Sequence, residues 1–208
     1  MKLTDAKKDY YRKLSKEEGY RSRSAYKLAQ LNKSYHILRP GTNVVDLGCA
    51  PGGWLQVAKK EVKQGKVVGI DILNVLPIEG VTIFQGDIED TRTVDLLIQA
   101  LNGKANTLLS DISPNVSGIW NIDHAKQISL SKHSLNIASR VLVTGGGAIL
   151  KVFEGELLKD FKKETEKYFR KVLLTKPLAS RQQSSELYMV CQGFILADSN
   201  RYHRRSQY

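Results

Sequence analysis

The feature that most constrains the fold is a regular alternation of short apolar runs with longer segments of helical periodicity. The apolar runs in the first half are NVVDLGC, KVVGIDI, VTIFQGD and TLLSDI, and helical stretches such as WLQVAKKEV and TVDLLIQAL lie between them. Strands that alternate with helices in this way indicate βαβ units and a parallel sheet.

The second half continues the alternation but ends it differently. A long helical segment near 122–142 is followed by the strand GGAILKVF, the helix ELLKDFKKETEKYF and the strand KVLLTKP, and then only a loop precedes LYMVCQGF. Parallel neighbours need a crossover of a dozen or more residues, so the last strand is expected to run antiparallel to its predecessor. The sequence predicts an α/β, Rossmann-like fold with a seven-stranded, mostly parallel sheet and helices on both faces.

The length of the chain limits the number of domains. With 208 residues, 41% of them hydrophobic, it can bury one substantial core and is too short for two ordinary domains. Residues 22–38 have the period of an amphipathic helix, which Arg39-Pro40-Gly41 ends. We expect a basic, helical N-terminal extension at 1–40, a main domain at 41–197, and a basic tail at 198–208 that orders only when bound.

The charge of the chain favours a polyanionic partner. Lys and Arg outnumber Asp and Glu by 32 to 21, which gives a net charge of +11. Basic residues crowd the first 40 positions and recur at Arg201, Arg204 and Arg205. Nucleic acid is the partner that this distribution indicates.

One basic segment also carries aromatic residues. Arg21, Arg23 and Lys27 are interleaved with Tyr20 and Tyr26, so the cations are candidates to bind RNA phosphates and the rings to stack on an unpaired base. A solvated helix face is the alternative interpretation of the two arginines.

Several function classes have no support in the sequence. Cys49 and Cys191 lack a CxxC partner and are expected to be reduced core residues, and the four histidines lack metal-ligand spacing, so no metal is expected. The charged N-terminus and the absence of a membrane-length apolar run predict a soluble, cytoplasmic protein that does not bind a membrane. We further expect a monomer.

A glycine-rich turn follows the first core strand. The segment DLGCAPGGW at 46–54 has the spacing G-x-x-x-G-G, whereas a dinucleotide-binding turn reads G-x-G-x-x-G, so NAD and FAD are disfavoured. Glycines let the backbone approach a ligand, and the next helix presents free N–H groups, which suits a nucleotide-like cofactor. The candidate cofactor residues in this turn are Gly48, Pro51, Gly52, Gly53 and Trp54.

Acidic residues end four successive strands. They are Asp46, Asp71, Asp87 and Asp111. Asp71 is placed to accept hydrogen bonds from both hydroxyls of an adenosine ribose, and Asp87 to meet the adenine amine. Any one of them alone is more simply explained as a helix cap, but their order along the chain favours a cofactor site.

These motifs together resemble the FtsJ (RrmJ) family of RNA ribose 2'-O-methyltransferases. The matching segments are D-L-G-x-A-P-G-G-W, G-x-D, G-D, S-D-x-x-P-N and K-x-F, and they cover nearly the whole chain. The resemblance implies a class I methyltransferase fold and S-adenosyl-L-methionine as cofactor, with Asp111 near the transferred methyl group. It also implies a catalytic tetrad, which falls on Lys27, Asp111, Lys151 and Glu186.

Methyl transfer from a sulfonium needs an oxygen nucleophile held in line with the methyl carbon. Lys151 is expected to orient or deprotonate the ribose hydroxyl, with Asp111 positioning it; Glu186 would hold Lys27 or help to arrange the ribose. In the segment SDISPN, no aromatic residue follows the proline at the place where amino-group methyltransferases stack a flipped base, so ribose is favoured over base. Trp120 is either a lid over the cofactor or a core anchor.

The resemblance leaves the substrate partly open. A uridine ribose in large-subunit (23S-like) ribosomal RNA, free or in the large subunit, is the first expectation, and transfer RNA is the runner-up. A non-catalytic RNA-binding assembly factor is an alternative of another class, although the complete motifs speak against it.

Overall fold

The fold of the chain is seen in a computed structural model that describes the backbone of residues 3–181 and 183–195, and the side chains from residue 10 onward within these ranges. The elements occur in the order α1 (Leu3–Glu17), α2 (Ala25–Tyr35), β1 (Val44–Leu47), α3 (Gly53–Val62), β2 (Val67–Asp71), β3 (Val81–Gln85), α4 (Arg92–Leu101), β4 (Ala105–Ser110), α5 (Trp120–Val141), β5 (Leu142–Phe153), α6 (Leu158–Thr165), β6 (Phe169–Thr175) and β7 (Glu186–Phe194). The expected basic tail lies outside the described residues.

The seven strands form one sheet in the order β3-β2-β1-β4-β5-β7-β6. All pairings from β3 across to β5 are parallel, whereas β7 is antiparallel to both β5 and β6. The expected seven-stranded sheet with an antiparallel last strand is confirmed. Because the parallel strands share one direction, the residues that follow β1, β2, β3 and β4 meet at the same carboxyl edge of the sheet.

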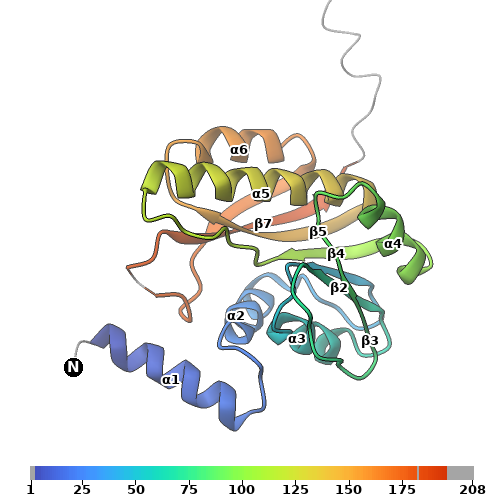
Figure 1. The fold of residues 1–208 in the computed structure, drawn as a ribbon. Coiled ribbons are helices and arrows are strands. Elements are labelled where there is room, and N and C mark those ends of the chain that lie inside the picture. The colour runs from blue at the N-terminus through green and yellow to red at the C-terminus, as the bar shows by residue number, and fades with distance from the viewer. Residues whose placement is uncertain (1–2, 182, 196–208) are drawn as a thin grey trace, which may run out of the picture.

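Helices cover both faces of the sheet, as expected (Figure 1). Apolar side chains of α4, α5 and α6 pack on one face, and those of α2 and α3 pack on the other. The inner strand β1 is buried throughout, as a parallel strand covered on both sides must be. These two half-cores fix the strand ends that carry the candidate site.

The N-terminal region contains two helices with different surroundings. Helix α2 belongs to the packed body, since Ala25, Leu28 and Leu31 are buried against the sheet. Helix α1 lies to one side of the body in Figure 1 and reaches α2 through Tyr11, whose hydroxyl accepts a hydrogen bond from Gln30. The division into three segments at residues 40 and 197 stays a prediction. No helix among residues 3–181 and 183–195 is long and apolar enough to cross a membrane.

Candidate active site

The glycine turn after β1 has the geometry of a backbone cradle. Gly48 and Gly52 have φ values of 69° and 110°, which residues other than glycine rarely adopt. An added Cβ would lie 2.2 Å from Ile112 at Gly48 and 2.3 Å from the Ser22 hydroxyl at Gly53. Gly52 also caps α3, so the free N–H groups of that helix open onto the turn. The glycines are therefore required by conformation and by space.

The acidic residues at the ends of β2 and β3 differ in their contacts. Asp71 accepts hydrogen bonds from the backbone N–H groups of Ala50 and Leu73, at 2.8 Å each, and so fixes the glycine turn. Asp87 is exposed and accepts a hydrogen bond from Glu89 N–H. It lines an open cleft of about 450 Å³ together with Ile70 and Gly86. Asp87 is thus open to a ligand, whereas the oxygens of Asp71 already have backbone partners.

Asp46 is a buried carboxyl group that lacks a hydrogen-bond partner. It is fully buried in β1, and neither of its oxygens finds a donor among the described residues. Burial raises the pKa of Asp46 well above its usual value, and the nearby carboxylates of Asp111 and Asp71 raise it further. Because Asp46 keeps its proton, the carboxylates of Asp71 and Asp111 supply the negative charge beneath the turn, which favours a ligand with a positive charge there.

Trp54 lies in the interior. Its side chain is 2% exposed, its indole N–H donates to the carbonyl of Ser24, and its ring packs against Tyr188 with 5.8 Å between centroids. In these contacts it joins α3 to the segment that enters α2. Direct contact of Trp54 with a cofactor stays a prediction.

The four residues expected to form the tetrad come together at the carboxyl edge of the sheet. Lys151 Nζ lies 2.8 Å from Asp111 Oδ1 and donates to the Asp111 carbonyl at 2.7 Å. Lys27 Nζ lies 2.5 Å from Glu186 Oε1, and Glu186 Oε2 lies 3.7 Å from Lys151 Nζ. Both lysines are only 8% exposed. Glu186 is therefore in contact with both lysine ammonium groups.

The charge of Glu186 is stabilised by this arrangement. Burial alone would raise the pKa of its carboxyl group, but Lys27 and Lys151 outweigh that effect and hold the pKa below its usual value. Ser180 also donates a hydrogen bond to Glu186 at 3.0 Å. The carboxylate consequently stays ionised between two buried ammonium groups at neutral pH.

Tyr188 is a member of the cluster that the sequence reasoning missed. Its fully buried hydroxyl donates to Asp111 Oδ1 at 2.7 Å, lies 3.2 Å from Glu186 Oε1, and accepts from Lys27 Nζ at 3.2 Å. Burial raises the pKa of Tyr188 well above its usual value, as do the carboxylates of Asp111 and Glu186. Tyr188 thus remains a neutral donor that links the two lysine–carboxylate pairs. Its place two residues after Glu186 on a strand was the available signal, because alternate residues share a face.

A basic cleft opens beside the cluster. Its volume is about 510 Å³, and its lining includes Arg23, Arg181, Lys27, Ser184 and Glu186. Burial lowers the pKa of Arg23, and the positive charge of Arg181 lowers it further, so the two guanidinium groups repel each other. An anion in the cleft would relieve that repulsion. Arg181 follows β6 in the sequence, and its part in the cleft was also missed.

Arg21 has a different environment from Arg23. Its guanidinium donates to the carbonyls of Leu76 at 2.5 Å, Pro77 at 2.8 Å and Pro51 at 3.2 Å. Its backbone N–H donates to Gln56, the side chain of which also bonds Gly19. Arg21 therefore ties the glycine turn to the loop after β2, and its expected contact with RNA stays a prediction.

Metal ligands are not grouped in the described part of the chain: within it, no three His, Cys, Asp or Glu side chains are arranged to hold an ion. Cys49 and Cys191 are buried free thiols in that part.

Comparison with known proteins gives matches over most of the chain. The model of the FtsJ-like methyltransferase family matches residues 20–194. A Nitrosopumilus maritimus protein named ribosomal RNA large subunit methyltransferase E is 54% identical over 94% of this chain and all of its own length, and a Methanothrix thermoacetophila protein of the same name is 50% identical over 93% of this chain and 75% of its length. A crystal structure of a putative ribosomal RNA methyltransferase from Plasmodium falciparum superposes with a TM-score of 0.77 at 30% identity, covering 84% of this chain and 98% of that one.

Proposed function

The chain belongs to the FtsJ-like methyltransferase family, and from that membership we propose that it methylates the ribose 2'-hydroxyl of a uridine in large-subunit (23S) ribosomal RNA. The names of its relatives support ribosomal RNA as the substrate class. The observation that carries the reaction type is the buried lysine–carboxylate cluster at the carboxyl edge of the sheet, where Lys151 Nζ lies 2.8 Å from Asp111. Such a cluster can hold and polarise a hydroxyl group.

S-adenosylmethionine as the methyl donor fits the residues beside this cluster. When bound, it supplies a methyl group bonded to a positively charged sulfur. The uncharged thioether that remains after methyl transfer is a good leaving group. The carboxylates of Asp71 and Asp111, which raise the pKa of Asp46, suit that positive charge. The turn that contains Gly48 and Gly52 would accept the cofactor against its backbone, and exposed Asp87 would receive the adenine amine.

Lys151 would act on the ribose hydroxyl. An ammonium group has three N–H donors, and two of them are directed to the carbonyl and the carboxylate of Asp111. The third has only the longer, 3.7 Å contact with Glu186 among the described residues, so it can bond the 2'-oxygen. In this position Lys151 would align an oxygen lone pair with the methyl carbon, and such alignment accounts for much of the rate in a displacement of this kind. As the C–O bond forms and the C–S bond of the donor breaks, the hydroxyl proton would pass to the ionised carboxylate of Glu186, which lies on the same side of Lys151.

The other members of the cluster would hold this geometry. Asp111 fixes Lys151 through two of its oxygens, and Tyr188 fixes Asp111. Lys27 and Glu186 form the far side of the site, where Glu186 faces the basic cleft and can arrange the ribose. The guanidinium groups of Arg23 and Arg181 in that cleft suit the phosphates on either side of the target nucleotide.

The proposal is tested by methyl transfer to defined RNA pools. Wild-type protein and Lys151→Ala are incubated with methyl-labelled S-adenosylmethionine and with large ribosomal subunits, free ribosomal RNA or transfer RNA. Labelled sites are then mapped by resistance to alkaline cleavage, because a 2'-O-methyl group blocks it. Label at a uridine of large-subunit RNA, lost in Lys151→Ala, is the expected result.

Lys104→Ala is the matched control, since Lys104 is exposed and precedes β4, at the opposite edge of the sheet. It should label RNA at the wild-type rate. Label confined to transfer RNA would contradict the proposed substrate and favour the runner-up. Absence of label in every pool, with intact cofactor binding, would instead favour a non-catalytic assembly factor.

A further inference from the structure

Trp120 is an exposed tryptophan at the start of α5. Its side chain remains 45% exposed, although tryptophan is a residue that proteins usually bury to a large extent. The indole lies nearly parallel to the rings of His124 and Phe153, with centroids 6.0 and 5.9 Å away. It is thus supported by two rings and retains a large surface that the described residues do not cover. This degree of exposure is unlike that of a core anchor.

The backbone around Trp120 is held in place. The carboxylate of Asp123 accepts hydrogen bonds from the N–H and the hydroxyl of Ser117 and from the N–H of Gly118. These bonds lower the pKa of Asp123, so they are strongest in its ionised form. The loop that precedes Trp120 is therefore fixed to the first turn of α5, and the indole is presented on an ordered support. A surface arranged in advance in this way loses little entropy when a ligand binds.

Helix α5 links Trp120 directly to the catalytic cluster. Seven residues further along the helix, Gln127 donates hydrogen bonds to the carbonyls of Ile112 and Lys151. Seven residues of α-helix correspond to about 10 Å along its axis. In addition, Phe153 beneath the indole is the cross-strand partner of Glu186. Trp120 consequently lies at the margin of the catalytic cluster, within reach of a nucleotide next to the target.

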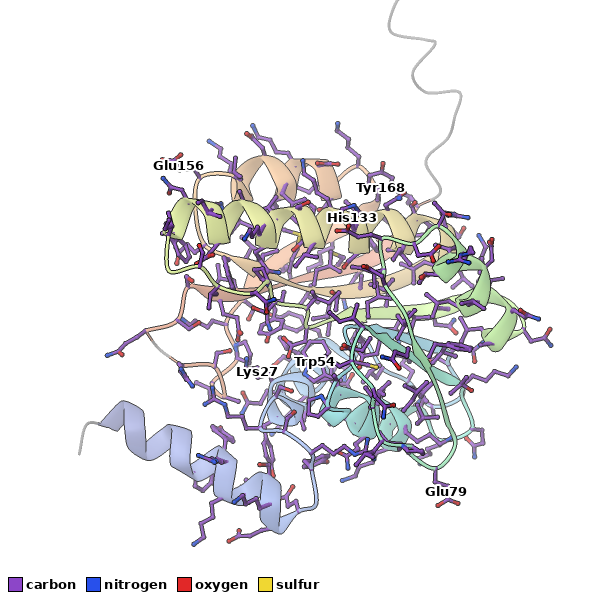
Figure 2. The ribbon with its side chains drawn as sticks, viewed as in Figure 1. Lys27, Trp54, Glu79, His133, Glu156 and Tyr168 are labelled. Carbon is purple, nitrogen blue, oxygen red and sulfur yellow. The ribbon has the colours of Figure 1, made fainter. Side chains whose placement is uncertain are left out.

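The location of Trp120 relative to the basic cleft suggests the path of the RNA. The cleft is lined by residues of α2, of the segment before it and of the loop before β7, and α2 lies below α5 in Figure 1. Trp120 is the first residue of α5, which packs on the opposite face of the sheet from α2. Figure 2 shows Lys27 of α2 below α5, and Glu156 of the loop before α6 above it. A strand held by its phosphates in the cleft would cross the cluster and reach the indole with a neighbouring nucleotide.

We propose that Trp120 is a stacking surface for an unpaired nucleobase adjacent to the methylated ribose. This inference rests on the proposed RNA substrate and adds a base contact to it. An indole carries no charge and offers an aromatic face, which stacks on any base and recognises none by hydrogen bonds. Trp120 therefore contributes affinity and placement of the RNA, while the nearby cations contribute the dependence of affinity on salt.

Tryptophan fluorescence tests the contact directly. The chain has two tryptophans, and Trp54 is 2% exposed and bonded to Ser24, so contact quenching by a base reports on Trp120. The probes are large-subunit ribosomal RNA, a single-stranded oligouridylate, and an abasic ribose-phosphate oligomer of the same length. We expect quenching by both base-containing RNAs, no quenching by the abasic oligomer, and no RNA-dependent quenching in Trp120→Phe. If neither of the two base-containing RNAs quenches the fluorescence, the inference is overturned.

Kinetics separate this inference from the proposed function. Trp120→Ala should weaken RNA binding by roughly 5- to 150-fold and raise KM for RNA accordingly, with KM for S-adenosylmethionine and the salt dependence unchanged. Trp120→Phe should retain most of the affinity, because a phenyl ring also stacks. Wild-type transfer with an unchanged KM in Trp120→Ala would refute the stacking surface alone. Quenching without transfer to any RNA would refute the proposed reaction and leave the stacking surface standing.

Discussion

Replacing Asp46 with asparagine should stabilise the protein, and the gain should increase with pH. The folded state raises the pKa of Asp46 through burial and through the charges of Asp111 and Asp71. Between the usual pKa of an aspartate, about 4, and this raised value, the folded chain keeps a proton that the unfolded chain has lost. Stability of the wild type must therefore fall as pH rises across that interval, whereas an asparagine has no proton to lose.

The size of the effect follows from linkage. One proton costs at most about 1.4 kcal/mol of stability per pH unit, and 1 kcal/mol shifts Tm by roughly 2–4 °C in a protein of this length. The Tm of Asp46→Asn relative to wild type should therefore rise by roughly 3–6 °C per pH unit between pH 4 and the raised pKa. Thermal unfolding is followed from pH 5 to 8 at constant ionic strength. Taking the difference in Tm between the two proteins removes the contribution of the ionisable groups that they share.

A control and a ligand sharpen this test. Asp160→Asn removes an exposed carboxyl group from α6, and its Tm difference from wild type should be independent of pH. S-adenosylmethionine should reduce the advantage of Asp46→Asn, because its positive charge stabilises an ionised Asp46, and it should bind the variant more weakly. A Tm difference between Asp46→Asn and wild type that stays flat across pH 5–8 would refute the claim that Asp46 is buried without compensation.

Three further variants test the contacts around the cluster. Arg21→Ala should raise KM for S-adenosylmethionine about tenfold through loss of bonds to Pro51 and the loop after β2, with a smaller increase in KM for RNA; steady-state kinetics check this, and a raised KM for RNA alone would contradict it. Arg181→Gln should weaken RNA binding and reduce the slope of log affinity against log salt by about 0.7–0.9, as measured by filter binding at several salt concentrations; an unchanged slope would exclude a phosphate contact. Tyr188→Phe should lower the free energy of unfolding by roughly 1–3 kcal/mol in urea, because Asp111 loses a buried donor, and unchanged stability would argue against that bond.

The fold was predictable from the sequence because its signals are local. Apolar runs of strand length and helical periods follow directly from the residues that face the two half-cores, and the short connection before β7 fixed its direction. The strand-end residues were predictable for the same reason. Asp71 ends β2, Asp111 follows β4, and Asp46 is next to the last residue of β1, and parallel strands bring their carboxyl ends together.

The parts of the site that were not predicted from the sequence depend on contacts between distant segments. Tyr188 resembles an ordinary apolar strand residue until the register of β5 and β7 pairs it with Lys151. Arg181 faces Arg23 only because the loop before β7 folds back over α2, and no periodicity encodes that approach. The carbonyl partners of Arg21 lie 30 to 56 residues away in the sequence. A charged side chain in a basic segment therefore gives no sign of whether it faces solvent, RNA or the protein itself.

The segment Arg21–Lys27 shows how much this distinction matters. Its three basic residues were all expected to contact RNA, and Lys27 also to belong to the tetrad. Their contacts divide them: Arg21 bonds the glycine turn, Arg23 faces the basic cleft, and Lys27 bonds Glu186. The entry to α2 thereby connects the cofactor side of the site to the RNA side through one short, well-packed stretch of chain. Movement of this stretch would disturb both sides at once, so binding of RNA in the cleft and binding of the cofactor at the turn should be energetically coupled. By linkage, each ligand would then change the affinity for the other by the same factor.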